Sequence, residues 1–127
     1  MQVIEFILYV NNQQESTEFY EFLFQQKAIL NVLGMTEFQL SENIKLGLMP
    51  NDGIAKILGT NTPHPTKGNG IPRCELYLKV PNPKVYMSRG IEKGAKLISA
   101  LTQRDWGDAV GYISDINGHI LAFAEEK

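Results

Sequence analysis

The sequence is poor in cysteine, in long apolar runs and in basic charge, and each shortage removes a class of protein. Its only cysteine, Cys74, has no partner for a disulfide within the chain, which predicts a reducing compartment such as the cytoplasm. No apolar run approaches the ~20 residues that a membrane-spanning helix needs. The net charge of -2 and the lack of a basic patch with interleaved aromatic residues argue against a nucleic-acid partner.

Familiar catalytic signatures are also missing from the sequence. It contains no phosphate-binding P-loop, no dinucleotide fingerprint and no Ser-His-Asp signature. Cys74 begins a predicted strand, one residue before Glu75, and strand alternation predicts that its thiol is a small buried group on the helix side rather than a nucleophile. His64 and His119 fall in predicted loops, where we expect solvated side chains.

The chain has 127 residues, of which 43% are apolar and 20% charged, a balance typical of one globular domain. Its first ten residues predict a strand rather than a signal peptide, because Glu5 interrupts them and no basic leader precedes them. The apolar periodicity predicts helices at Gln13–Gln26 and Lys84–Lys93. Strands are expected at about Val3–Val10, Ile29–Leu33, Thr36–Leu40, Ile44–Met49, Cys74–Val80, Lys96–Leu101, Ala109–Ser114 and His119–Ala124.

Residues 50–72 interrupt this pattern because glycine and proline recur in them. They predict a long loop with about one helical turn at Ile54–Leu58. Such a segment is a candidate linker, lid or partner contact.

The same order of elements occurs before and after this loop. Glu5–Val10 aligns with Glu75–Val80, and Ile44–Leu48 aligns with His119–Phe123. The sequence therefore predicts an α+β fold of two tandem βαβββ modules. We expect one domain, residues 1–127, whose modules span about 1–49 and 73–127 and are joined by the loop 50–72.

Several short motifs, in this order, resemble those of the vicinal oxygen chelate superfamily. These motifs are Ile7–Val10 followed by a helix with Phe19-Tyr20, then Arg104–Asp108, Gly111-Tyr112, Asp115–His119 and Phe123–Glu125. The superfamily includes glyoxalase I, extradiol dioxygenases, fosfomycin-resistance enzymes and bleomycin-binding proteins. The resemblance implies a cupped, mixed but mostly antiparallel sheet, with helices on its outer face and a small-molecule cavity inside. It also implies a homodimer, which would cover exposed strand edges.

Metal-dependent members of the superfamily take their ligands, usually His and Glu, from four equivalent strand positions. The resemblance places these positions at Glu5, Gly47, Glu75 and Ala122. Gly47 and Ala122 have no side-chain donor, and even catalytic zinc usually keeps three protein ligands. We therefore expect a degenerate metal site and no cofactor. The alternative is a metal-dependent lyase or dioxygenase that takes its missing donors from elsewhere, for example a partner subunit.

Strand alternation predicts which side chains face the cup. Glu5 and Glu75 then form a carboxylate pair that binds a cationic ligand or serves as acid and base. The alternative is that both lie at strand ends in water or pair with Lys45, Lys79 or Arg73.

An aromatic wall for a flat ligand is predicted from Tyr9, Met49, Tyr77, Trp106 and Tyr112. The alternative is that these residues belong to the core or to a dimer interface. Trp106 favours the first interpretation, because it lies in a polar Arg-Asp-Trp-Gly-Asp segment.

These features favour a glyoxalase/bleomycin-resistance-like protein that binds or sequesters a cationic or aromatic small molecule, and they leave catalysis open. A third hypothesis is a regulatory module whose loop 50–72 contacts a partner.

Overall fold

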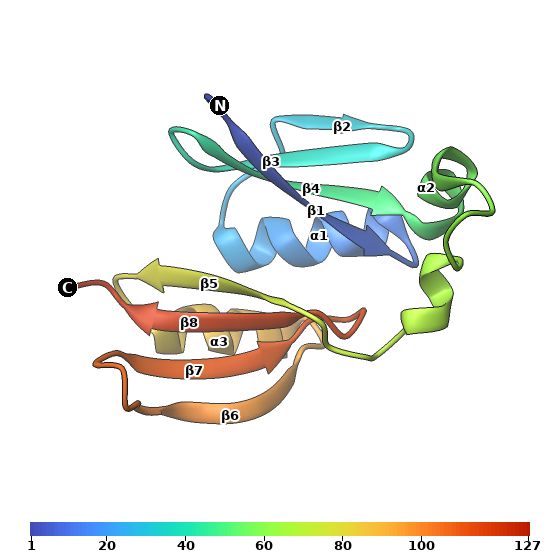
Figure 1. Ribbon diagram of the computed structural model, residues 1–127. Helices are drawn as coiled ribbons and strands as arrows, with labels where there is room; N and C mark the ends of the chain where they lie inside the picture. The colour runs from blue at the N-terminus through green and yellow to red at the C-terminus, as the bar shows by residue number, and fades with distance from the viewer. The chain divides into compact units, whose positions relative to one another are not determined.

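The computed structural model describes all residues, 1–127, and the chain forms two compact units. The first unit comprises Met1–Glu21 and Gln25–Asn69, and the second comprises Phe22–Phe24 and Gly70–Lys127. Each unit contains one four-stranded sheet (Figure 1).

Sheet A, in the first unit, has the strand order β1-β4-β3-β2. Its strands are β1 (Ile4–Val10), β2 (Leu30–Val32), β3 (Met35–Ser41) and β4 (Ile44–Pro50). β1 pairs with β4 in parallel, whereas the β2–β3 and β3–β4 pairs are antiparallel. The helix α1 (Gln13–Phe24) follows β1 and provides the crossover that a parallel pair requires.

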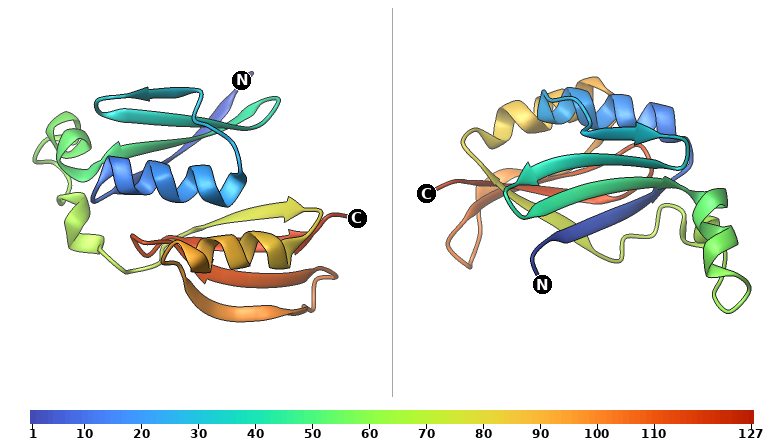
Figure 2. Two further views of the ribbon diagram at one scale, coloured as in Figure 1. Left: turned by 180° about the vertical axis from the view of Figure 1, so that it is seen from behind. Right: turned by 90° about the horizontal axis from the view of Figure 1, so that it is seen from above.

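Alternation along the strands divides sheet A into a face under α1 and a face away from it, which we call the far face. On the helix side, Leu8, Leu46 and Phe38 are buried. The Tyr20 ring of α1 lies 6.4 Å from the Phe38 ring, and Figure 2 shows α1 running along this side of the sheet. The core of the first unit therefore lies between α1 and sheet A.

Two features of the first unit differ from the predictions. α1 ends at Phe24 rather than Gln26, because Gln25 adopts a left-handed conformation with φ 52°. The segment 50–72 is not mainly loop. It contains α2 (Asn51–Leu58), which buries Ile54, and the short 3₁₀ helix η1 (Pro65–Gly68).

Sheet B, in the second unit, has the strand order β5-β8-β7-β6. Its strands are β5 (Glu75–Val80), β6 (Lys96–Gln103), β7 (Ala109–Ser114) and β8 (Ile120–Glu125). β5 and β8 are parallel, and the other pairs are antiparallel. The helix α3 (Pro83–Glu92) lies along one face of this sheet (Figure 2). There its Tyr86 ring stacks on the Phe123 ring at 5.6 Å.

The prediction of an α+β fold of two tandem βαβββ modules is confirmed, with the strands arranged as two four-stranded mixed sheets. The prediction for Cys74 is wrong, because its side chain is exposed. β5 begins only at Glu75, so Cys74 lies outside the strand and α3 does not cover it. None of the helices combines the length and hydropathy that spanning a bilayer requires.

We predict that the turn before β8 tolerates no side chain at Gly118. Gly118 has a φ of 91°, and a Cβ there would lie 2.9 Å from the Cα of Gly70. Gly118→Ala should therefore lower the free energy of unfolding by about 2 kcal/mol or more, because backbone strain adds to the clash. The measurement is urea unfolding of the full chain.

Gly34→Ala is the matched control, since Gly34 also has a positive φ, 94°, but nothing lies within 4 Å of its added Cβ. It should cost about 1 kcal/mol. Equal losses for both variants would show that the approach of Gly70 is not a constraint.

Candidate functional site

A carboxyl group occupies the centre of the far face of sheet A. In the strand register, Gly47 of β4 lies between Ile7 of β1 and Glu37 of β3. A Cβ on Gly47 would lie 2.6 Å from Oε2 of Glu5. The Glu5 carboxyl therefore fills the space that a side chain at position 47 would take.

The Glu5 carboxyl has few polar contacts to offset its burial. Its Oε2 is buried and has no hydrogen-bond partner. The pKa of Glu5 is raised from 4.5 to about 6, chiefly by burial and also by a hydrogen bond with Glu37 and by charge repulsion from it, while Lys45 opposes the shift. Lys45 lies 4.0 Å from the Glu37 carboxylate. Glu5 and Glu37 thus form a carboxyl pair in which Glu5 holds its proton more readily than an isolated carboxyl.

Tyr9 and Met49 lie beyond Glu5 on the same face. They are register partners in β1 and β4, and the Tyr9 ring is 37% exposed. Together with Glu5, they are the predicted ligand residues that the first unit contributes.

A hydrogen-bonded aromatic cluster occupies the face of sheet B away from α3, which we likewise call its far face. The Tyr77 hydroxyl donates to Oδ2 of Asp108 at 2.6 Å and accepts from the indole Nε1 of Trp106 at 2.9 Å. Asp108 is 8% exposed, whereas the Trp106 side chain is 59% exposed. An accessible indole is therefore held by the half-buried Tyr77 hydroxyl, which is itself bound to a buried carboxylate.

Neighbouring groups shift the pKa values of Tyr77 and Asp108 in opposite directions. Desolvation and the hydrogen bond to Asp108 raise the pKa of Tyr77. The hydrogen bond from Tyr77, together with Lys79 and Lys127, lowers the pKa of Asp108, although burial opposes this. Asp108 is thus a stable carboxylate, and Tyr77 keeps its proton.

Arg104 is fixed at the other side of this cluster. Its guanidinium donates to the carbonyl oxygens of Val110 and Ala100 and to the hydroxyl of Ser99. It also lies 5.2 Å from the centre of the Tyr112 ring.

Tyr77 and Tyr112 pack over the small residues of β8. Both are register partners of Ala122, and both contact the buried cluster of Val110, Ala122 and Ala124. The structure thus brings Tyr77, Tyr112 and Trp106 together. Glu75, by contrast, is exposed at the start of β5 and has no place in this hydrogen-bonded cluster.

The residues at the four inferred metal positions do not fit a metal. The space at Gly47 is taken by Glu5, and Ala122 is fully buried beneath two tyrosines. No group of three or more His, Cys, Asp or Glu side chains is placed to hold an ion. These four positions therefore do not supply the side-chain donors that a four-ligand metal site needs.

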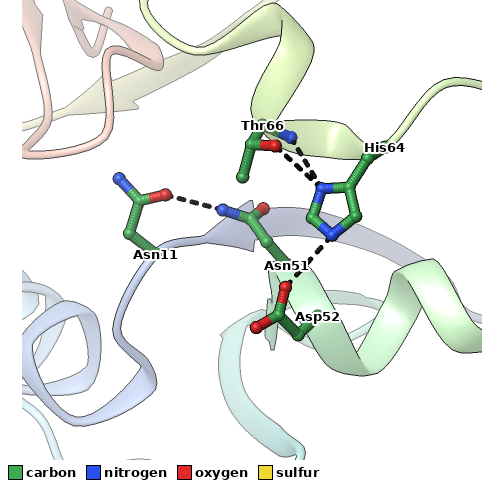
Figure 3. Close-up of polar contacts among 5 residues, drawn as sticks. All are labelled: Asn11, Asn51, Asp52, His64 and Thr66. Carbon is green, nitrogen blue, oxygen red and sulfur yellow. Dashed lines mark hydrogen bonds and ion pairs between the residues drawn. The ribbon is translucent and has the colours of Figure 1, made fainter.

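A second polar cluster lies where β1 and β4 end (Figure 3). Nδ2 of Asn51 donates to Oδ1 of Asn11 at 2.7 Å. His64 bridges α2 and η1, with its Nε2 3.0 Å from Oδ1 of Asp52 and its Nδ1 2.9 Å from the Thr66 hydroxyl.

The Thr66 backbone N–H also points to Nδ1 of His64, at 3.2 Å. Because an N–H can only donate, Nδ1 accepts and Nε2 carries the proton donated to Asp52. His64 is thus the N-cap of η1 and ties it to α2, rather than a solvated loop residue.

His119 also differs from the solvated side chain that we expected. Its ring lies 2.9 Å from Asp115, whose other oxygen accepts from the backbone N–H groups of Asn117 and His119. These contacts shape the turn before β8, so Asp115 and His119 have a structural role.

Sequence reasoning missed Glu37, Arg104 and Asp108. Alternation along β3 puts Glu37 on the far face, but only the register shows that it meets Glu5 across Gly47. Asp108 and Arg104 flank the turn around Trp106, and the clustering of charges in Arg104–Asp108 was the available signal.

Solved structures of similar fold cover nearly the whole chain. A glyoxalase-related enzyme from Fulvimarina pelagi superposes with a TM-score of 0.82 at 19% identity, over 99% of this chain and 88% of that one. A glyoxalase/bleomycin resistance protein from Albidiferax ferrireducens gives 0.72 at 17% identity, over 99% and 100% of the two chains. At these identities the likeness concerns the fold alone.

Curated relatives match a shorter stretch. An uncharacterised protein of Mycobacterium bovis is 31% identical over 72 residues, which are 57% of this chain and 47% of that protein. A Mycobacterium tuberculosis protein, also uncharacterised, is equally similar over 42% of its length. The chain spans less than half the length of these relatives. The family model of the glyoxalase-like domain, however, matches residues 3–126. The chain therefore belongs to the glyoxalase-like domain family.

Proposed function

We propose that this protein binds a small molecule carrying an aromatic ring, and that it does so without a resident metal. The single observation that supports this most strongly is the exposed indole of Trp106, which is held by its hydrogen bond to Tyr77. An accessible aromatic side chain in a fixed position stacks a ligand without a further loss of conformational entropy.

The composition of the two far faces supports the same proposal. Gly47 and Ala122 supply no metal donors, and the space around them is filled by Glu5 and by the two tyrosines. Tyr9, Met49, Glu5 and Glu75 stay predictions as ligand residues, and the proposal for Trp106 does not depend on them. Binding or sequestration of the ligand, rather than its chemical conversion, is the function that such a donor-poor site supports best.

The proposal includes a homodimer in a reducing compartment. β2 and β6 are sheet edges, and apolar side chains on them, Leu30, Val32, Leu97 and Ile98, are exposed. Burial of such edges against a second copy would remove unpaired backbone groups from water. The exposed thiol of Cys74 is compatible with a cytoplasmic location.

We predict a native mass of twice the 14.3 kDa of the chain. Native mass spectrometry of the purified protein measures it directly. A monomer at micromolar concentration would contradict the dimer and leave the ligand-binding proposal to be judged separately.

We predict saturable binding of simple aromatic compounds in the presence of a chelator. The protein has one tryptophan, so the indole N–H of Trp106 gives one resonance that reports directly on this surface. Tyr77→Phe removes the hydroxyl that holds the indole and should weaken binding by about three- to tenfold, which is the worth of one ordinary hydrogen bond.

Tyr86→Phe is the matched control, because Tyr86 lies on the opposite face of sheet B, stacked on Phe123. It should leave binding unchanged. Stoichiometric metal in the purified protein, or binding that appears only after metal is added, would overturn the proposal in favour of a metal-dependent lyase or dioxygenase.

We predict that Glu5→Gln stabilises the protein at neutral pH. The folded-state pKa of Glu5, about 6, lies above its ordinary value of 4.5, so the folded state holds this proton more tightly than the unfolded state. Its contribution to stability is present at low pH and is lost as the pH rises from about 4.5 through about 6. Partial exposure screens the repulsion, so the expected gain above pH 7 is about 1 kcal/mol or less.

The difference in the free energy of unfolding between Glu5→Gln and the parent protein should disappear at pH 4. Glu42→Gln, in the exposed turn between β3 and β4, is the control and should show no such pH dependence. A Glu5→Gln variant that is less stable at pH 7 would show that the ionised carboxylate is a favourable partner in the fold.

A further inference from the structure

The charged side chains on the far face of sheet B are unevenly distributed. Lys79 lies on this face because its register partner is Ala124, and its Nζ is 3.8 Å from Oδ2 of Asp108. Lys127 reaches the same carboxylate, with its Nζ 3.4 Å from Oδ1. Two lysines therefore share one buried carboxylate, the same group that accepts the hydrogen bond from Tyr77.

The other charged residues nearby do not pair with the two lysines. Asp105 and Glu126, which are next to Trp106 and Lys127 in the sequence, are exposed and form no ion pair with Lys79 or Lys127. Arg104 lies over Tyr112 and donates only to carbonyl and hydroxyl oxygens, so no carboxylate neutralises it. Glu75 is the acidic residue of the strands on this face, and it lies at the opposite end of β5 from Lys79. The two residues are four positions apart along the strand, a distance of about 13 Å. At ordinary ionic strength, salt screens most of the interaction between exposed charges at that distance.

The lysines are also accessible to a ligand. Their side chains are 56% and 65% exposed, whereas that of Asp108 is 11% exposed. The buried Asp108 carboxylate thus positions the two ammonium groups, and the solvent-exposed sides of both remain open to a ligand. An anionic group placed there would meet two cations next to a fixed indole.

From this arrangement, and resting on the proposed aromatic binding, we infer that the ligand is an aromatic anion. Its ring stacks on Trp106, and its carboxylate, or a group of the same charge, is bound by Lys79 and Lys127. This differs from the cationic ligand that the acidic residues Glu5 and Glu75 predicted from the sequence. The cations of the second unit are arranged around the aromatic cluster itself, whereas Glu5 and Glu75 are not part of it.

Three probes of similar size and different charge test the inference: phenylacetate, phenylacetamide and phenethylamine. Each is titrated into the full-length protein with a chelator present, and the Trp106 indole N–H resonance is followed. Phenylacetate should bind about five- to tenfold more tightly than phenylacetamide, the effect of one or two exposed charge pairs, and phenethylamine most weakly. Added salt should weaken the binding of phenylacetate alone.

The double variant Lys79→Gln with Lys127→Gln should bring the affinities of phenylacetate and phenylacetamide to within about twofold. The control, Lys67→Gln with Lys84→Gln, changes the net charge equally at exposed lysines of η1 and α3 and should preserve the preference. Loss of the preference in both double variants would show a general charge effect and overturn the inference.

The outcomes also separate this inference from the proposed function. If none of the probes binds, aromatic binding itself is wrong. If phenylacetamide or phenethylamine binds as tightly as phenylacetate or more tightly, aromatic binding stands and the anionic ligand is wrong. Preferential binding of phenylacetate, lost only in the Lys79 and Lys127 variant, supports both.

Discussion

In both units, the first strand is hydrogen-bonded in parallel to the last, and the other features described here depend on this pairing. It sets Ile7 opposite Gly47 in sheet A and Tyr77 opposite Ala122 in sheet B. Each unit therefore has a small residue at the same point of its last strand. Because side chains alternate between faces, the helix covers one side of each sheet and the residues around these small positions gather on the other.

The two units use this shared geometry for different chemistry. Around Gly47, the space is filled by the carboxyl of Glu5, whose pKa is raised by burial and by the neighbouring Glu37. Around Ala122, it holds two tyrosines, one of which connects an exposed indole to a buried carboxylate. A repeated backbone thus presents a carboxyl pair in one unit and, in the other, an aromatic cluster with two exposed lysines.

Much of the fold followed from the sequence, because periodicity and turn residues are local signals. Alternation also predicted that Tyr77 and Ala122 share the face away from the helix, and the two are register partners in sheet B. The sequence did not show the carboxyl pair, because the meeting of Glu5 and Glu37 across Gly47 depends on strand register. Of α2 it predicted only about one turn, Ile54–Leu58, because Gly53 and the nearby prolines favour a loop unless tertiary contacts bury Asn51 and Ile54.

The parallel pairings have a consequence for how the chain folds. They join residues far apart in sequence, such as Glu5 with Lys45 and Glu75 with Ile120, whereas β3–β4 and β7–β8 close across short turns. The hairpins can form early, but each sheet is complete only when its first strand returns to its last. Such non-local closure is the slow step in mixed α/β topologies. Before it occurs, β4 and β8 are unprotected edges, so the newly made chain is most prone to aggregation in that interval.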